Sequence, residues 1–214
     1  MKLEWIGHAC FRMTAQDGTV VITDPYDASV GIEMIPLEAD LITMSHSHHD
    51  HCEESMIAGS PVIARGPEMA AVGSVTARAI PSYHDDAKGA LRGANYIRIF
   101  SIDGLTVVHL GDQGCMPDED DLEAIADADV MMIPCGGTYT VDAAGAKAIA
   151  LAAKPRCVVP MHVKTKRVGY PIAKVDAFLA EMGDADAPPF SVIELSEGHV
   201  PQGVVLMAPL ADEL

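Results

Sequence analysis

Residues 45–51 read Ser-His-Ser-His-His-Asp-His and place four of the chain's nine histidines within six residues, directly after a short apolar run that predicts a buried strand. Side chains two positions apart in an extended segment share a face, so His46 and His48 can converge on one metal ion. As the chain turns beyond them, Asp50 and His51 can face a second ion. We therefore expect a loop of mixed nitrogen and oxygen ligands, a donor set suited to zinc.

Three isolated residues could supply the further ligands that a two-metal site needs, including one that bridges both ions. His84, Asp112 and His162 each come just after an apolar, strand-like run. A layered sheet fold places residues at such strand ends along one rim, where functional side chains gather. We expect all three to meet the histidine loop.

The remaining pattern predicts an antiparallel start followed by strand-helix units. Strands are expected at Lys2–Ile6, Cys10–Thr14, Thr19–Thr23, Leu41–Met44, Pro61–Ala64, Leu105–Leu110, Val130–Ile133 and Cys157–Met161. Helices are expected near His51, shortly after Ala64, from Pro117, over Asp142–Ala153 and over Ile172–Met182, with a linker-like stretch at Gly183–Pro189. This order favours two mixed sheets packed face to face with helices outside, in a single domain spanning residues 1–214.

Composition and charge indicate which classes of partner and which cellular compartment to expect. Among 214 residues, 14 Lys and Arg face 31 Asp and Glu, and this net charge of −17 repels a phosphate backbone, so we expect no nucleic-acid partner. Five cysteines without a C-x-x-C pair indicate a reducing compartment. No signal peptide or membrane helix is evident. We expect a soluble, cytoplasmic protein that acts on a small molecule and does not bind membranes, and a homo-oligomer is left open.

The sequence resembles the metallo-β-lactamase superfamily. Asp24 in Thr-Asp-Pro, the loop His46–His51, His84, Asp112 and His162 follow the order of that superfamily's five signature elements. Trp-Ile-Gly-His-Ala-Cys-Phe, Pro-Cys-Gly-Gly-Thr-Tyr-Thr and Pro-Met-His, which begin at residues 5, 134 and 160, are similar to a branch of predicted metal-dependent hydrolases. That branch is related to bacterial ascorbate-6-phosphate lactonase. The likeness covers residues 1 to about 165.

This resemblance implies an α/β fold, the four-layer αβ/βα sandwich, with two divalent metal ions in a cleft at the sheet rim. It assigns His46, His48 and His84 to one ion and Asp50, His51 and His162 to the other, with Asp112 as the bridge. It also implies that Asp24 lies under the histidine loop and orients it, a role that fixes imidazole tautomers. Zinc is the expected metal, and manganese, iron or nickel accept the same ligands.

Four further residues are candidates for supporting roles. His8 lies in a Gly-His-Ala turn and can either line the cleft as a proton donor, together with Asp50, or be a turn residue only. His109 precedes Asp112 by three positions, which favours hydrogen bonding beneath the site over ligation. Lys164 and Arg167 belong to the densest basic cluster, and they either anchor a carboxylate or phosphate of the substrate or form a solvated loop.

The expected activity is hydrolysis by a metal-bound hydroxide, acting on a small, anionic ester, lactone or amide. One alternative is a phosphodiesterase for a nucleotide or phospholipid-like substrate, which the same metal ions would serve. Another is a non-catalytic metal-binding scaffold, against which the full set of seven ligands argues. A diiron oxidase is disfavoured because His48 stands where Glu would be expected.

Overall fold

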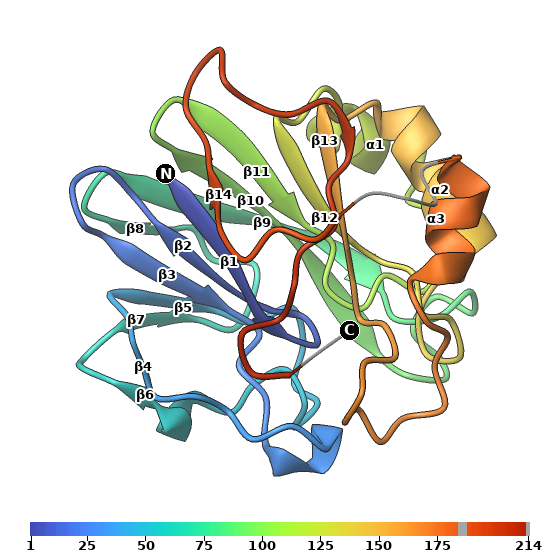
Figure 1. Cartoon of the computed structure of the whole chain (residues 1–214), viewed down its shortest axis with the longest axis horizontal. Helices are drawn as coiled ribbons and strands as arrows, with labels where there is room; N and C mark the ends of the chain where they lie inside the picture. The colour runs from blue at the N-terminus through green and yellow to red at the C-terminus, as the bar shows by residue number, and fades with distance from the viewer. Residues whose placement is uncertain (184–187, 213–214) are drawn as a thin grey trace.

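The computed structural model describes residues 1–183 and 188–212, so most of the linker-like stretch predicted at Gly183–Pro189 lies outside the described residues. Its first sheet has six strands in the order β14-β1-β2-β3-β5-β7 (Figure 1). These are β1 (Lys2–Gly7), β2 (Cys10–Thr14), β3 (Val20–Thr23), β5 (Leu41–Thr43), β7 (Val62–Ala64) and β14 (Ile193–Glu194). Strands β1 to β3 pair antiparallel, as the sequence predicted, whereas β3, β5 and β7 pair parallel.

The second sheet has seven strands in the order β15-β13-β12-β11-β10-β9-β8. These are β8 (Ala70–Val72), β9 (Val75–Tyr83), β10 (Ala94–Ile102), β11 (Leu105–His109), β12 (Val130–Pro134), β13 (Cys157–Met161) and β15 (Gly203–Val204). Strands β8 to β11 pair antiparallel, and strands β11, β12, β13 and β15 pair parallel. A separate pair of short strands, β4 (Leu37–Glu38) and β6 (Ile57–Ala58), lies beside the first sheet.

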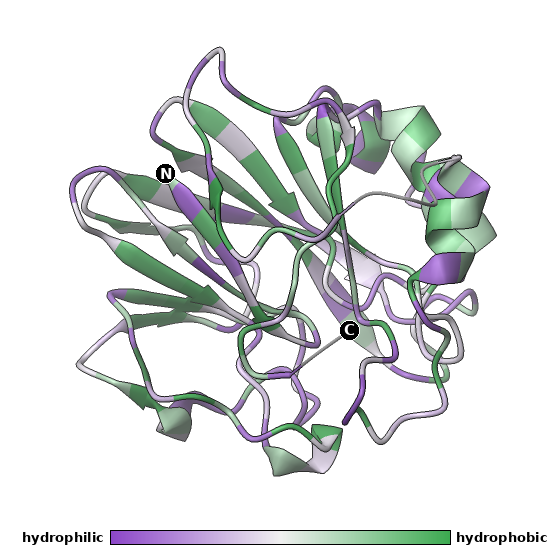
Figure 2. Ribbon diagram, viewed as in Figure 1, coloured by the Kyte–Doolittle hydropathy of each residue, from purple (hydrophilic) through white to green (hydrophobic). Residues whose placement is uncertain are grey.

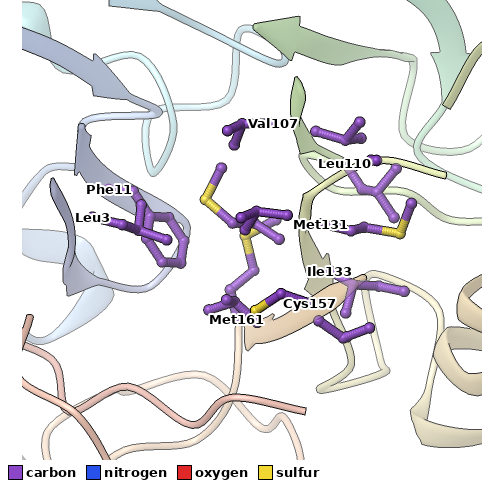
Figure 3. Close-up of a cluster of buried hydrophobic side chains, with 14 of the residues drawn as sticks. Leu3, Phe11, Val107, Leu110, Met131, Ile133, Cys157 and Met161 are labelled. Atoms are coloured by element: carbon purple, nitrogen blue, oxygen red, sulfur yellow. The ribbon is translucent and has the colours of Figure 1, made fainter. Parts of the chain in front are cut away.

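The main hydrophobic core fills the space between the two sheets. Figure 3 shows Leu3 and Phe11 of the first sheet on one side of this cluster and Val107, Met131 and Met161 of the second sheet on the other. All five side chains are 0% exposed. Full burial of such a side chain stabilises the fold by roughly 1.5–3 kcal/mol. Hydrophobic residues dominate the strands of both sheets in Figure 2. The two sheets are therefore held as one sandwich by their facing sides.

Helices cover the outer face of the second sheet. They are α1 (Glu119–Ile125), α2 (Ala143–Ala153) and α3 (Asp176–Met182), with α2 and α3 beyond β12 and β13 in Figure 1. Asp118 and Asp142 cap the first two by accepting backbone N–H groups. On the first sheet the outer layer includes Tyr26, Ile32 and the short 3-10 helix Ala28–Val30 between them. Across the described residues, no helix is long and apolar enough to cross a membrane.

Two helix predictions were wrong, and a third helix begins later than predicted. Near His51 the chain makes a turn, and a 3-10 helix follows only at Glu54–Met56. After Ala64 the sequence Arg-Gly-Pro leads into β8 without a helix, as glycine and proline would favour. The last helix begins four residues later than Ile172, because Ala173 donates its N–H to the Gly136 carbonyl and accepts from the Lys164 N–H.

Strand directions bring both sheets to a common rim. In the first sheet, β1, β3 and β5 run the same way, so the turn at His8, Asp24 and the histidine loop all follow strand ends at one edge. In the second sheet, β9, β11 and β13 share a direction, so His84, Asp112 and His162 also follow strand ends at one edge. The two edges meet, and every polar group predicted for the metal site lies there.

Candidate metal centre

Asp112 is the centre of the histidine cluster. Its Oδ2 lies 3.1 Å from Nε2 of His84, 3.4 Å from Nε2 of His162 and 4.0 Å from Nε2 of His46. Its Oδ1 lies 3.2 Å from Nε2 of His51. The carboxylate is 2% exposed. One buried acidic side chain thus faces imidazole nitrogens that come from four separate points of the sequence.

Most of the donor atoms fall into two groups around this carboxylate. One nitrogen of each of His46, His48 and His84 lies within 4.8 Å of the others. The second group, with the same limit, contains His8, Asp50, His51 and His162. The structure therefore brings together all seven ligands that the resemblance implies, and it adds His8 to the second group.

Asp24 holds the histidine loop from below. It is 0% exposed, and its Oδ1 accepts the Ser45 N–H at 2.7 Å. Its Oδ2 accepts Nδ1–H of His51 at 2.8 Å, which leaves Nε2 of His51 facing Asp112. The Ser45 hydroxyl, also bonded to Asp24, lies 2.9 Å from Nδ1 of His46. One carboxylate thus orients two of the candidate ligands.

Replacing Asp24 with alanine is expected to lower metal affinity about 10- to 100-fold, the usual effect of losing a partner behind a ligand. The affinity can be measured by competition with a chromophoric chelator. Asp40→Ala is the matched control, because Asp40 also accepts a backbone N–H, that of Val20 at 2.9 Å, but at the other end of the first sheet. Equal affinity in the two variants would contradict the role of Asp24.

A buried amide fixes the backbone of Asp112. Oδ1 of Asn95 accepts the Asp112 N–H at 3.0 Å, and its Nδ2 donates to the Leu110 carbonyl at 2.9 Å. Between them Gly111 has φ of 56°, and a Cβ there would lie 2.4 Å from Oδ1 of Asn95. His109, the last residue of β11, also supports this segment. Its Nδ1 accepts the Gly111 N–H at 3.1 Å, and its Nε2 donates to the Ala9 carbonyl at 2.8 Å. The structure thus gives His109 hydrogen-bonding partners beneath the site.

A buried arginine connects the histidine loop to the second sheet. Arg98 on β10 is 0% exposed, and its guanidinium donates to the Met44 carbonyl at 2.6 Å and to the Ala64 carbonyl at 2.9 Å. These carbonyls lie at the ends of β5 and β7 in the first sheet. Hydrogen bonds from a charged donor are worth roughly 1.5–3 kcal/mol. Sequence reasoning missed both Asn95 and Arg98, since β10 was not predicted.

His84 and His162 are oriented by backbone groups. Nδ1 of His84 donates to the Tyr139 carbonyl at 3.1 Å, which directs Nε2 toward Asp112. His162 has φ of 52° and donates its N–H to the His8 carbonyl at 3.0 Å. His8 and Asp24 also adopt positive φ, at 53° and 40°. Non-glycine residues in this region are strained, and such strain gathers at functional sites.

His8 lies inside the cluster. Its Nε2 is 3.3 Å from Oδ2 of Asp50, and its ring centroid is 4.1 Å from that of His162. Burial, followed by the neighbouring His162, lowers the pKa of His8 to about 4. Burial likewise lowers the pKa of His46 to about 3. Both imidazoles are thus neutral near pH 7, which is the form that binds a metal ion.

The charges of the other groups follow from mutual attraction. Burial acts to raise the pKa of Asp112, but His162 and His51 outweigh it and hold that pKa well below its ordinary value. Burial acts to lower the pKa of His51, but Asp112 and Asp24 outweigh it and raise that pKa well above its ordinary value. Asp112 is therefore an anion at neutral pH, as a metal ligand must be.

The cluster fits a metal centre because it leaves ligand atoms unused. Among the described residues, Nε2 of His46, Nε2 of His51 and Oδ1 of Asp112 are buried and make no well-aligned hydrogen bond, although the last two lie 3.2 Å apart. An unpaired buried polar atom costs roughly 1–3 kcal/mol. All three atoms lie in the same cluster, where divalent cations would use them as ligands. The site therefore has the donor atoms and the burial that a metal ion requires.

A cavity of about 380 Å³ opens onto the cluster. It is lined by His48, His49, Asp50, His84, Arg92, Asp112, Tyr139 and Tyr170. The rings of Tyr139 and Tyr170 meet edge to face with centroids 5.8 Å apart. Sequence reasoning missed Arg92 and both tyrosines. Tyr139 lies in the Pro-Cys-Gly-Gly-Thr-Tyr-Thr motif, which could have indicated it, whereas Arg92 has no local signal.

Lys164 and Arg167 do not line this cavity. The Lys164 ammonium donates to the carbonyls of Val168 and Tyr170, the latter at 3.2 Å. Nε of Arg167 faces Oδ1 of Asp212 at 3.9 Å. Both side chains thus have partners within their own part of the surface. The substrate-anchoring role predicted for them has no support in this geometry, and the cation at the cavity is Arg92.

Known proteins resemble the chain in sequence and structure. Residues 2–162 match the family model described as Beta-lactamase superfamily domain. UPF0173 metal-dependent hydrolases from Thermoplasma acidophilum and Archaeoglobus fulgidus are both 29% identical, covering 77% and 82% of this chain and 84% and 87% of the relatives. A crystal structure from Thermotoga maritima, of a candidate Zn-dependent hydrolase of the metallo-β-lactamase superfamily, matches with TM-score 0.80 and 30% identity over 96% of this chain and 97% of that one.

Proposed function

The chain belongs to the metallo-β-lactamase superfamily as a metal-dependent hydrolase, and on that premise we propose that it uses two divalent metal ions to hydrolyse a small, anionic ester, lactone or amide. The observation that carries this proposal is the carboxylate of Asp112, which faces both groups of donor atoms. A carboxylate in that position can bridge two ions.

Zinc is the first candidate for the metal. The donor groups contain imidazole nitrogens and carboxylate oxygens, and among the described residues no cysteine sulfur belongs to them. Such a set suits catalytic zinc, while manganese, iron and nickel also accept it. When bound, two such ions would supply a water molecule acidified toward neutral pH and positive charge for a developing oxyanion.

The chain's own residues would position and deprotonate that water. Oδ2 of Asp50, at the edge of the cavity, is placed to accept a proton, and Nε2 of His8 at 3.3 Å holds this carboxylate in position. Asp50 is only 14% exposed, so its hydrogen bond is protected from bulk water. Asp24, Asn95 and the Tyr139 carbonyl keep the imidazoles and Asp112 in place without contacting the substrate.

The size of the cavity favours a small-molecule substrate. Its volume of about 380 Å³ falls at the low end of ligand sites in proteins. Tyr139 and Tyr170 give one wall an apolar surface, and Arg92 gives it a positive charge. A net charge of −17 opposes binding of nucleic acids. An ester, lactone or amide with an anionic group fits this combination.

Metal analysis combined with a substrate panel tests the proposal. We expect about two equivalents of metal per purified chain, one for each group of donor atoms. We also expect cleavage of carboxylic esters or lactones that a chelator abolishes. One equivalent of metal at saturation would contradict the two-metal proposal. Cleavage of phosphodiesters alone would favour a phosphodiesterase, and binding of metal without any cleavage would favour a scaffold.

A further inference from the structure

We propose that Arg92 and Tyr139 form an anion-binding subsite in the cavity, which selects substrates that carry a carboxylate or phosphate group away from the bond that is cleaved. This inference rests on the proposed function in one respect: it takes the cavity beside the metal centre as the place where the substrate binds. It adds the residue that recognises the anionic group and the part of the substrate that this group occupies.

The loop that carries Arg92 is held by one buried carboxylate. Asp85 is 2% exposed. Its Oδ1 accepts the N–H groups of Ala87 and Gly89 at 2.8 and 2.9 Å, and its Oδ2 accepts those of Leu91 and Arg92 at 3.0 and 2.7 Å. Since Asp85 follows the candidate ligand His84 directly, the position of Arg92 is fixed relative to the metal centre.

The guanidinium is also held at its far end. Nη2 of Arg92 donates to the Thr138 carbonyl at 3.1 Å, and its Cζ lies 5.9 Å from the centroid of the Tyr139 ring. The Tyr139 carbonyl in turn accepts Nδ1–H of His84. Arg92 is therefore oriented by the same segment that orients a candidate ligand, and it loses little conformational freedom when an anion binds.

The charge of Arg92 is not neutralised within the described part of the chain, where no carboxylate pairs with it. Three of the other six arginines are paired with a carboxylate: Arg12 with Glu4, Arg65 with Glu54 and Arg167 with Asp212. A guanidinium has five N–H donors, and one bond to Thr138 leaves others for a ligand. Its flat fork matches a carboxylate or phosphate with two parallel hydrogen bonds. Tyr139 and Tyr170 would pack against the apolar part that joins this anion to the scissile group.

The test compares three esters of 4-nitrophenol that differ only at the end of the acyl chain: the neutral butyrate, the carboxylate-bearing hydrogen glutarate and the 4-phosphonobutyrate. Arg92→Ala in the metal-loaded enzyme should raise KM for one or both anionic esters about tenfold or more, as expected for the loss of a charge-assisted pair. KM for the butyrate should change less than twofold, and Arg92→Lys should restore part of the loss. The anionic ester with the larger change identifies the preferred group.

Arg78→Ala is the matched control. Arg78 also makes one side-chain bond to a backbone carbonyl, from Nη2 to Ala124 at 3.1 Å, but it lies outside the cavity lining. This variant should leave KM for all three esters unchanged. If Arg92→Ala changes the neutral and anionic esters equally, or changes none of them, the subsite is overturned while the hydrolase proposal stands.

Calorimetry separates failure of the subsite from failure of the proposed function. Glutarate is titrated into metal-loaded wild type, Arg92→Ala and Arg78→Ala. Binding that is about tenfold or more weaker only in Arg92→Ala supports the subsite, even if no ester is cleaved and the hydrolase proposal fails. Equal affinity in all three proteins overturns the subsite, whatever the esters show.

Discussion

Replacing Asp112 with asparagine is expected to reduce the rate of hydrolysis more than about 100-fold. Loss of a partner behind a ligand costs about 10- to 100-fold, and loss of a bridging ligand should exceed the upper end of that range. Asn keeps the shape of Asp and the N–H that Asn95 binds, but it removes the negative charge that faces the imidazole nitrogens of both donor groups. Bound metal should therefore fall below two equivalents per chain. Metal analysis and kcat/KM on the same preparation measure both effects.

Asp129→Asn is the control for this prediction. Asp129 accepts the Thr106 N–H at 2.9 Å, just before β12, at the edge of the second sheet opposite Asp112. The substitution is the same, and it leaves the rim untouched. Full metal content and near wild-type activity are expected for it. If Asp112→Asn retained two equivalents of metal and its activity, Asp112 would not be a bridging ligand.

Removing the metal should lower the melting temperature by about 10 °C. Ligand binding at 1,000 times Kd stabilises a protein by about 4.1 kcal/mol. For a chain of this size each kcal/mol shifts Tm by roughly 2–4 °C. The physical cause is the set of buried atoms on His46, His51 and Asp112 that make no well-aligned hydrogen bond in the described structure. Calorimetric scans with chelator, and after zinc is returned, measure the shift.

The variant Asp112→Asn provides the comparison for this second prediction. With its affinity reduced, it should melt near the temperature of the chelated wild type and gain little on addition of zinc. Matching melting temperatures for wild type with and without metal would contradict the prediction. Equal melting temperatures would mean that hydrogen bonds alone, without metal, stabilise the residues of the rim.

The metal cluster was predictable because its pattern is local. His46, His48 and His51 lie within one loop after an apolar run, and His84 and His162 follow strand-like runs of their own. A strand end at the rim of a layered fold is sufficient to bring such residues together. Nothing more than chain order and residue type was needed. The structure accordingly brings these side chains to one place.

The supports of the cluster were not predictable in the same way. Asn95 and Arg98 act through carbonyls and N–H groups more than ten residues away in sequence, at Leu110 and Met44. Their roles depend on how β10 pairs and on which loop packs beneath it. No local sequence pattern predicts the pairing of β10 or the loop that packs against it. Lys164 is a different case: its closeness in sequence to His162 suggested a substrate contact, and in the structure its ammonium group donates to backbone carbonyls.

The division of the rim between two sheets determines when the metal centre can exist during folding. Residues up to 64, which form most of the first sheet, include His8, Asp24 and the histidine loop, but three of the seven candidate ligands follow β9, β11 and β13. The last of them, His162, emerges from the ribosome after nearly all of the second sheet. The complete set of candidate ligands therefore exists only after both sheets have been synthesised and docked. Occupancy of both groups of donor atoms would for that reason report that the two sheets have come together.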